Sequence, residues 1–173
     1  MKTIYIALGS NLGDRARNIA RAIEALGAHG VHVTRESSLY ETEPVDARGG
    51  WFLNCVVEGE TELMPRQLMR ALLAIERSLG RKNRMAADAE GPREPRAMDM
   101  DILLFGSSVV QAPDLEIPHP RMIERRFVLV PLAEIAPEVR HPLVHETVAE
   151  LLARAEDRGQ VRRFSRTGAH PPQ

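Results

Sequence analysis

Cysteine is almost absent from this chain, with one residue, Cys55, among 173. A single cysteine forms no intramolecular disulfide, which fits a reducing compartment. Residues 1–8 lack the pattern of a signal peptide, so we expect a cytoplasmic protein. Because Cys55 lies in the strand-like stretch 52–57, we expect a buried, inert thiol.

Aromatic residues are also scarce, at 4%, and the formal net charge is only −1. Proteins that bind single-stranded RNA stack its bases on exposed aromatic side chains and carry basic patches. The composition therefore argues against a nucleic-acid partner, and any anion site must be local. No apolar run approaches the roughly 18 residues that cross a bilayer, so we expect no membrane association.

The common motifs for phosphate and zinc are missing. The chain has no Gly-x-x-x-x-Gly-Lys-Ser/Thr and no Gly-x-Gly-x-x-Gly, and the glycine-rich segment 9–13 contains no lysine. It also has no His-Glu-x-x-His, no paired-cysteine spacing and no nucleophile elbow. Any phosphate chemistry must therefore use other residues.

What is present is a mixture of strand and helix patterns in a length suited to one domain. Strand patterns cover about 4–8, 31–40, 52–60, 98–105 and 127–130. Helix patterns cover about 15–26, 65–79 and 147–155. This order, with two strands that suggest a hairpin, predicts an α+β sandwich of the ferredoxin-like kind, a mainly antiparallel sheet with helices packed on it.

The sequence also predicts where the domain ends. We expect a single domain over residues 1–159, followed by a flexible tail over 160–173 that is basic and then proline-rich. The polar segment 81–97 has no usable periodicity, and so long a loop in a compact domain is usually functional or disordered. We expect this loop to close over its ligands and exclude water.

Asp99 and Asp101 form the sharpest local signal. Residues two apart on a strand point to the same face, so the two carboxylates project together. Met98, Met100, Ile102 and Leu104 should then project from the other face. Adjacent carboxylates repel each other unless a cation lies between them, and Mg²⁺ prefers such hard oxygen ligands. The alternative is a solvated strand face that binds nothing.

Arginines and a histidine surround this pair in the sequence. Guanidinium groups beside a dicarboxylate are suited to a polyphosphate, whose transfer needs positioning and charge neutralisation. Any one of these residues could instead serve only to keep a loop soluble. The residues are Arg81, Arg84, Arg93, Arg96, His119, Arg121, Arg125 and Arg126.

Over nearly its whole length the chain resembles the 6-hydroxymethyl-7,8-dihydropterin pyrophosphokinase family. Each matching block is weak alone, but their order and spacing are specific. The blocks are ALGSNLG (7–13), SSLYETEP (37–44) with FLN (52–54), PRAMDMDILLFG (95–106), and IPHPR (117–121) with RRFVLVPL (125–132).

The resemblance implies a reaction that the residues alone do not reveal. ATP, as co-substrate, would donate its β,γ-pyrophosphoryl group to the hydroxymethyl oxygen of 6-hydroxymethyl-7,8-dihydropterin, on the route to folate, and AMP would leave. Two Mg²⁺ ions would bridge the phosphates, and one would lower the pKa of the pterin hydroxyl. The family also suggests a monomer.

The resemblance also assigns residues to the nucleotide and the metal. Asp99 and Asp101 would be the metal carboxylates. The nucleotide would be held by phosphate-facing Arg81, Arg84, Arg96 and Arg125, by His119, by Glu76 as an acid lining its site, and by a backbone contact of Ile102 to adenine. Between residues 80 and 96 the chain is longer than the family's shorter members, and Arg93 stands where a tryptophan is frequent.

For the pterin, the resemblance implies a pocket formed by Thr42, Pro44, Val45 and Asn54, with Phe52 and Phe127 on the two faces of the ring. A flat heterocycle with polar edges suits two aromatic faces and an amide that both donates and accepts. Without the resemblance, core packing is the simpler role for both phenylalanines. Trp51, beside this block, is either a lid residue or a packing residue.

Two other functions stay open from the residues alone. A two-metal nucleotidyl transferase on a ferredoxin-like palm would also present paired aspartates, but it would release pyrophosphate rather than AMP. A ferredoxin-like RNA-binding module is the second alternative, and the few aromatic residues count against it.

Overall fold

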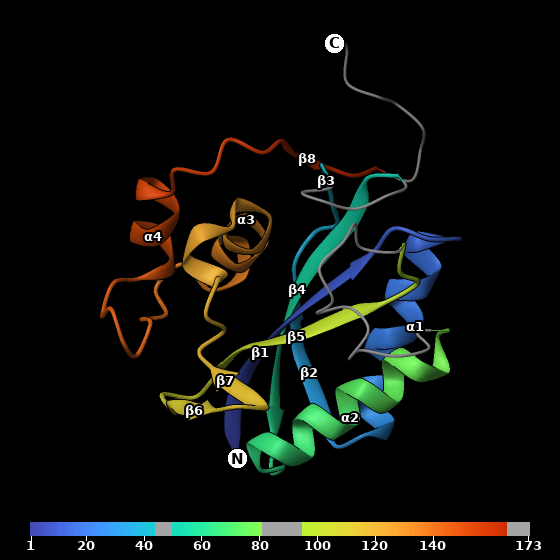
Figure 1. The fold of residues 1–173 in the computed structure, drawn as a ribbon, viewed down its shortest axis with the longest axis horizontal. Coiled ribbons are helices and arrows are strands. Elements are labelled where there is room, and N and C mark those ends of the chain that lie inside the picture. Colours follow the sequence, from blue (N-terminus) through green and yellow to red (C-terminus); the bar gives the residue numbers. More distant parts are fainter. Residues whose placement is uncertain (44–49, 81–94, 166–173) are drawn as a thin grey trace.

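The computed structural model describes residues 1–43, 50–80 and 95–165. In these parts of the chain a six-stranded sheet forms the centre of the fold (Figure 1), with the order β5-β1-β4-β3-β8 and with β2 also paired to β4. Every pair is antiparallel. The strands are β1 (Lys2–Ser10), β2 (Val31–Glu36), β3 (Tyr40–Thr42), β4 (Phe52–Thr61), β5 (Asp99–Phe105) and β8 (Val161–Arg163).

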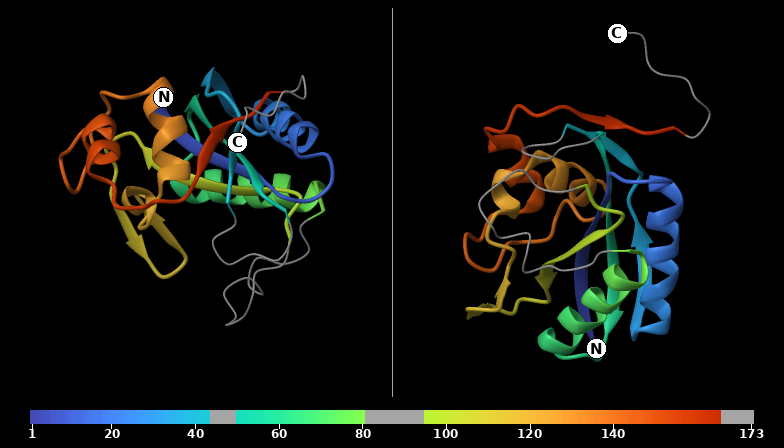
Figure 2. Two further views of the ribbon diagram at one scale, coloured as in Figure 1. Left: turned by 90° about the horizontal axis from the view of Figure 1, so that it is seen from above. Right: turned by 45° about the vertical axis from the view of Figure 1, so that its right-hand side comes forward.

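Helices cover both faces of this sheet, as Figures 1 and 2 show. The helices are α1 (Arg15–Ala28) and α2 (Pro65–Ser78) on one face, and α3 (Arg126–Ile135) and α4 (Val148–Arg154) on the other. Between β5 and α3 the chain forms a hairpin of β6 (Val110–Ala112) and β7 (Leu115–Ile117) and a short 3₁₀ helix, η2 (Met122–Glu124).

Each face of the sheet has its own apolar core. Ile19 and Leu26 of α1, with Leu68 and Leu72 of α2, recur at helical spacing and are buried against the first face. On the second face, Val128, Leu129, Leu132 and Ile135 of α3 pack with Val148 and Leu151 of α4. The sheet is therefore buried on both sides, and any cavity must form where small or polar residues interrupt a core.

The connections confirm the predicted α+β class. The run β1-α1-β2, with β4 paired between its two strands, and the run β4-α2-β5, with β1 paired between, form the split βαβ arrangement of ferredoxin-like folds. The predicted strands at 4–8, 52–60 and 98–105 and all three predicted helices are present, with ends that differ by a few residues.

The predicted strand at 127–130 is wrong, because these residues belong to helix α3. A short continuous apolar run fits either a buried strand or a buried helix, and only a longer window separates them. The helix continues through Pro131 to Ile135, so its apolar spacing becomes visible only beyond the predicted strand.

The predicted side of Leu104 is also wrong. The register between β1 and β5 shifts between Tyr5 and Ile6, and Leu103 lies at that irregularity, so the alternation of β5 is broken there. Leu103 and Leu104 consequently both pack in the core under α3, whereas Met100 and Ile102 pack in the core under α1 and α2 as expected.

Two segments differ in detail from the sequence expectation. The strand expected from 31 to about 40 is divided into β2 and β3, which pair with different parts of β4. Residues 161–163, placed in the expected flexible tail, form β8 against β3, and residues 166–173 lie outside the described part of the chain. None of the described helices is long and apolar enough to span a membrane.

The turn between α3 and α4 is organised by a buried histidine. His141 is 5% exposed, and its Nδ1 accepts hydrogen bonds from the backbone N–H groups of Leu143 (3.2 Å) and Val144 (3.3 Å). Its backbone N–H donates to the Glu146 carbonyl, and its carbonyl accepts from the N–H of His145. Burial, and then the nearby His145, lower the pKa of His141, so the ring is held neutral.

We predict that acid weakens this turn. A neutral buried ring means that the unfolded chain binds the extra proton, so stability present above the ordinary histidine pKa of about 6.5 is lost as the pH falls below it. The free energy of unfolding in urea, measured from about pH 7 to about pH 5, should fall less steeply for His141→Gln, by up to about 1.4 kcal/mol per pH unit. His32→Gln, at an exposed histidine, is the control; equal slopes in His141→Gln and the unmodified protein would contradict this account.

Candidate active site

A cavity of about 480 Å³ opens on the α3 side of the sheet. Its floor is formed by the ends of β1, β4 and β5. Its walls are formed by β3, by α3 and the segment that leads into α3, and by the segment that follows α4. The lining residues are Ala7, Leu8, Gly9, Thr42, Glu43, Phe52, Asn54, Cys55, Arg96, Asp99, Asp101, Leu103, His119, Arg121, Glu124, Arg125, Phe127, Val128 and Asp157.

The register of the sheet places the key side chains of the floor in one row. Gly9 of β1 lies opposite Asn54 of β4 on one side and Asp99 of β5 on the other. Directly opposed residues of antiparallel strands point to the same face. A Cβ atom at Gly9 would lie 2.6 Å from the Asn54 Oδ1 atom, so only glycine leaves room for this amide. Gly9 therefore lies between the Asn54 amide of β4 and the Asp99 carboxylate of β5.

Asp99 and Asp101 both line the cavity, as expected from their spacing. Arg96 lies 3.3 Å from the Asp99 carboxylate, whose side chain is 25% exposed. Among the described residues, no group of three or more His, Cys, Asp or Glu side chains forms a complete metal site. Two hard carboxylates on one strand face fit a Mg²⁺ ion whose other ligands come from water and phosphate oxygens.

Two hydrogen bonds with Asn11, in the loop after β1, hold the backbone of Arg96. The Asn11 Oδ1 atom accepts a hydrogen bond from the Arg96 N–H (2.6 Å), and the Asn11 N–H donates to the Arg96 carbonyl (2.9 Å). Asn11 is 7% exposed, and its Nδ2 atom has no hydrogen-bond partner among the described residues. From the sequence alone, Asn11 has no predicted role beyond its place in the block ALGSNLG (7–13).

The segment before α3 adds two arginines and a histidine to the cavity. His119, Arg121 and Arg125 line the cavity. The backbone N–H of His119 donates to the Leu103 carbonyl (3.0 Å), and its Nδ1 atom lies 3.2 Å from the Arg121 N–H. The Arg125 guanidinium lies over the Phe127 ring, 5.4 Å from its centroid, which aligns a cation with an aromatic wall.

On the side towards β3, the cavity has aromatic walls and a fixed amide. Phe52 and Phe127 both line it. The Asn54 Nδ2 atom donates to the Thr42 hydroxyl at 2.5 Å, and both residues are less than a tenth exposed. This hydrogen bond fixes the orientation of the Asn54 amide, with its Nδ2 atom towards Thr42. The arrangement suits a flat ring with polar edges.

Glu76 and Ile102, which the resemblance assigned to the nucleotide, do not line this cavity. Glu76 is 1% exposed, and its Oε1 atom accepts a hydrogen bond from the Met100 N–H (2.8 Å), on the edge of β5 that faces away from β1. Glu76 therefore holds the strand that carries the two aspartates. Ile102 is 7% exposed and packs under α1 and α2.

Several predicted site residues lie outside the described part of the chain. These are Pro44, Val45, Arg81 and Arg84, together with Arg93 and the expected closing loop apart from residues 95–97. Conversely, the sequence reasoning gave no role to Gly9, Glu43, Glu124 or Asp157, although all four line the cavity. Only the sheet register and long-range packing bring them there.

Cys55 is among the residues that line the cavity, but its side chain is only 1% exposed and packs in the core under α1 and α2. Burial, and then the charge of Glu36, raise the pKa of its thiol to about 12. A thiol that stays protonated is a poor nucleophile, so Cys55 takes no part in covalent chemistry, as the sequence predicted.

The family model for 7,8-dihydro-6-hydroxymethylpterin-pyrophosphokinase (HPPK) matches residues 5–137. This chain belongs to the HPPK family. The match contains every described residue of the floor of the cavity, and it ends before α4 and β8.

Curated relatives agree with this placement in the HPPK family. The chain is 45% identical over 137 residues to the 2-amino-4-hydroxy-6-hydroxymethyldihydropteridine pyrophosphokinase of Bacillus subtilis, covering 78% of each chain. It is 42% identical over 161 residues to the protein of the same name from Methylorubrum extorquens, covering 92% of this chain and 97% of that one. It is 37% identical to the Folic acid synthesis protein fol1 of Pneumocystis carinii, but spans only 20% of that longer protein.

Solved structures support the HPPK fold. The crystal structure of wild-type Plasmodium falciparum HPPK-DHPS with SDX-DHP matches with a TM-score of 0.67, covering 88% of this chain and 43% of that chain. The sequence identity is 15%, so this likeness concerns the fold alone. The chain thus spans less than half of the two-part Plasmodium protein.

We predict that the close approach at Gly9 is needed for the site of this HPPK-family chain. Gly9→Ala should displace the Asn54 amide and lower the free energy of unfolding by about 1–3 kcal/mol, as overpacking does. Gly27→Ala is the matched control, because a Cβ atom there would have no atom within 4 Å apart from its chain neighbours and the backbone of its own helix. The measurements are urea unfolding and the NMR side-chain amide signals of Asn54; unchanged Asn54 signals in Gly9→Ala would contradict the prediction.

Proposed function

We propose that this chain transfers the β,γ-pyrophosphoryl group of ATP to the hydroxymethyl oxygen of 6-hydroxymethyl-7,8-dihydropterin, releasing AMP, as a step of folate biosynthesis. The observation that carries the proposal is one cavity, in a member of the HPPK family, with paired carboxylates and arginines at one end and two phenylalanines with a fixed amide at the other. A pterin ring and a polyphosphate need these two ends side by side.

The end of the cavity towards β3 would hold the pterin. Phe52 and Phe127 would contact the two faces of the ring, with Asn54 and Thr42 at its polar edge. Because the Asn54 Nδ2 donates to the Thr42 hydroxyl, the Asn54 Oδ1 is left as an acceptor for a ring N–H or amino group. By family resemblance, Pro44 and Val45 would also form part of this pterin pocket.

The opposite end would hold the triphosphate of ATP. Arg96 and Arg125 would neutralise its phosphates, with Arg81 and Arg84 contributing from the loop after α2, and His119 would contact the nucleotide. Asp99 and Asp101 would hold Mg²⁺, in two ions by family resemblance, and the bound metal would supply charge neutralisation at the phosphates and a lower pKa at the pterin hydroxyl. By family resemblance, Glu76 would line the nucleotide site and the backbone of Ile102 would contact adenine, both from behind β5.

The chemical step requires little from the protein beyond alignment. The hydroxymethyl oxygen forms a bond to the β-phosphorus, the bond from that phosphorus to the α,β-bridging oxygen breaks, and the hydroxyl proton is released. AMP leaves with the bridging oxygen. Since Asn54, Gly9 and Asp99 lie in one row, the pterin edge and the metal carboxylate are held at a fixed separation by the sheet.

In the described part of the chain, the paired aspartates also fit the alternative nucleotidyl transferase, but the family match favours the pyrophosphokinase over both alternatives. The proposal includes a monomer, on the ground of family resemblance alone. A cytoplasmic location is part of the same proposal, on the ground of the single buried cysteine.

We predict that AMP formation depends on the pterin and on both aspartates. With ATP, Mg²⁺ and 6-hydroxymethyl-7,8-dihydropterin, Asp99→Asn and Asp101→Asn should each lower kcat/KM by at least about a hundredfold, because each loses charge stabilisation of the transferred group. Asp114→Asn is the control, since that exposed carboxylate pairs only with Arg66 among the contacts of the described residues. AMP would be quantified by chromatography.

Two results would overturn this assignment. Release of pyrophosphate instead of AMP would indicate a nucleotidyl transferase. AMP formation at the same rate without the pterin would indicate a nucleotide hydrolase.

A further inference from the structure

The last described segment of the chain lies against the cavity although it falls outside the family match. Residues 157–164, here called the C-terminal strap, follow α4 and include β8, whereas the HPPK model ends at residue 137. Figures 1 and 2 show this segment passing from α4 to the sheet edge beside β3. We propose that the strap is a positioning element that holds the two walls of the pterin pocket, with Asp157 and Arg162 as its main contacts.

Asp157 anchors the first wall. Its Oδ2 atom accepts a hydrogen bond from the Arg126 N–H (3.0 Å), at the first residue of α3, and its Oδ1 atom accepts from the Gly159 N–H (2.8 Å). The residue at the N-cap position of α3, Arg125, provides no side-chain cap. A carboxylate at a helix N-terminus satisfies a free N–H and favours the helix dipole. Asp157 therefore fixes the first turn of α3, which contains Phe127, and Asp157 itself also lines the cavity.

β8 anchors the second wall. It pairs with β3 so that Val161 lies opposite Thr42 and Arg163 opposite Tyr40. The backbone N–H of Phe164 extends the ladder to the Leu39 carbonyl (2.8 Å). Without the strap, β3 would be a three-residue edge strand, paired only with β4 and with unpaired N–H and C=O groups along its other side. Thr42, which orients the Asn54 amide, lies on this strand.

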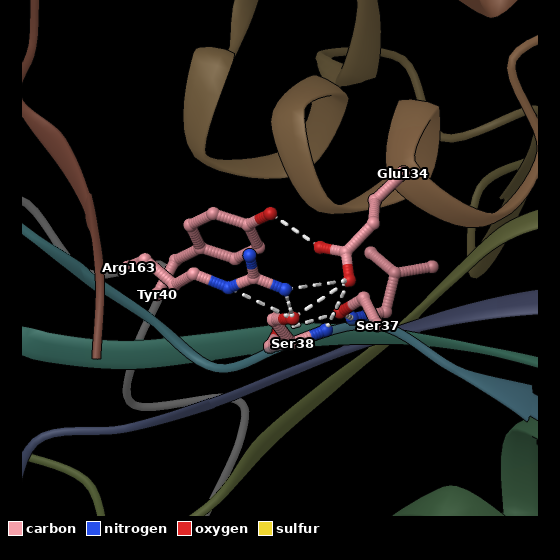
Figure 3. A network of polar contacts seen from close by, with 6 residues as sticks. Ser37, Ser38, Tyr40, Glu134 and Arg163 are labelled. Carbon is pink, nitrogen blue, oxygen red and sulfur yellow. Dashed lines mark hydrogen bonds and ion pairs between the residues drawn. The ribbon is translucent and has the colours of Figure 1, made fainter. Parts of the chain in front are cut away.

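A polar network joins the two walls (Figure 3). Glu134 of α3 accepts hydrogen bonds from the Tyr40 hydroxyl and from the Ser38 N–H (2.8 Å) and hydroxyl (2.7 Å). Arg163 of the strap bonds to Ser38 and lies 3.7 Å from Glu134. These contacts lower the pKa of Glu134 despite its partial burial, so the carboxylate stays charged. The strap thus ties β3 to the same helix that Asp157 caps.

The strap also holds Trp51, the residue before Phe52. The Arg162 guanidinium lies 4.2 Å from the centroid of the Trp51 ring. Arg15 of α1 donates a hydrogen bond to the Trp51 carbonyl (2.8 Å), and the Arg15 guanidinium lies 5.7 Å from the centroid of the Phe164 ring. The ring of Trp51 is therefore held by Arg162 and its backbone by Arg15, directly before Phe52, which lines the cavity.

This inference rests on the proposed function, because it assigns the strap to the pterin end of that site. Asp157→Ala should raise KM for the pterin about fivefold to tenfold, in line with the loss of a helix cap, while kcat changes less than twofold. Asp157→Asn keeps an oxygen acceptor and should recover most of the loss. Glu156→Ala is the matched control, since it removes an exposed carboxylate one residue away.

Arg162→Ala provides a second test at the surface, where misfolding is not expected. It should raise KM for the pterin severalfold and change the emission of Trp51, the only tryptophan, because the cation over its ring is lost. Arg158→Ala, at an exposed arginine of the same segment, is its control. Thermal unfolding of each variant separates a shifted pocket from a lost fold.

The outcomes distinguish the strap from the function itself. If the unmodified protein forms no AMP from ATP and the pterin, the proposed function fails. If it forms AMP, but Asp157→Ala and Arg162→Ala have the same pterin KM as Glu156→Ala and Arg158→Ala, the role of the strap is overturned. A loss confined to kcat, with KM for the pterin unchanged, would also overturn it.

Discussion

The antiparallel pairing of β1 with both β4 and β5 is the constraint on which the site depends. It sets Asn54, Gly9 and Asp99 in one row and leaves glycine in the middle, where any side chain would collide with the amide. Because sheet hydrogen bonds fix the spacing of neighbouring strands, the distance between the two ends of the cavity is set by backbone geometry. If either pair of strands shifted its register by one residue, a side chain of the site would move to the opposite face of the sheet and into the other core.

The surroundings of this row act mainly by holding backbone segments in place. Asn11 clasps the backbone of Arg96, and Glu76 accepts from the backbone of Met100, beside the two aspartates. Asp157 does the same for the start of α3. A polar side chain that satisfies a backbone N–H away from water is costly to lose, so each of these contacts restricts the movement of the loop, strand or helix end that it holds.

Local pattern was enough to predict much of this architecture. Alternation on β5 placed Asp99 and Asp101 on one face, and helical spacing located α1 and α2. Prediction failed where the deciding contact is distant in sequence: α3 was taken for a strand because its first residues are uniformly apolar, and Leu104 changes face at an irregularity set by β1. Asp157 lies 31 residues from the N–H that it caps, and no local periodicity indicates such a pairing.

The position of Asp157 bears on inhibitor selectivity. The floor of the cavity is built from segments within the family match, so a compound that fills only the floor would meet the part of the site that relatives are expected to share. Asp157 lines the same cavity from beyond the matched region. A ligand extended from the floor towards that carboxylate, with a cationic group at its end, would make a contact with the C-terminal strap, outside the residues that the family model matches.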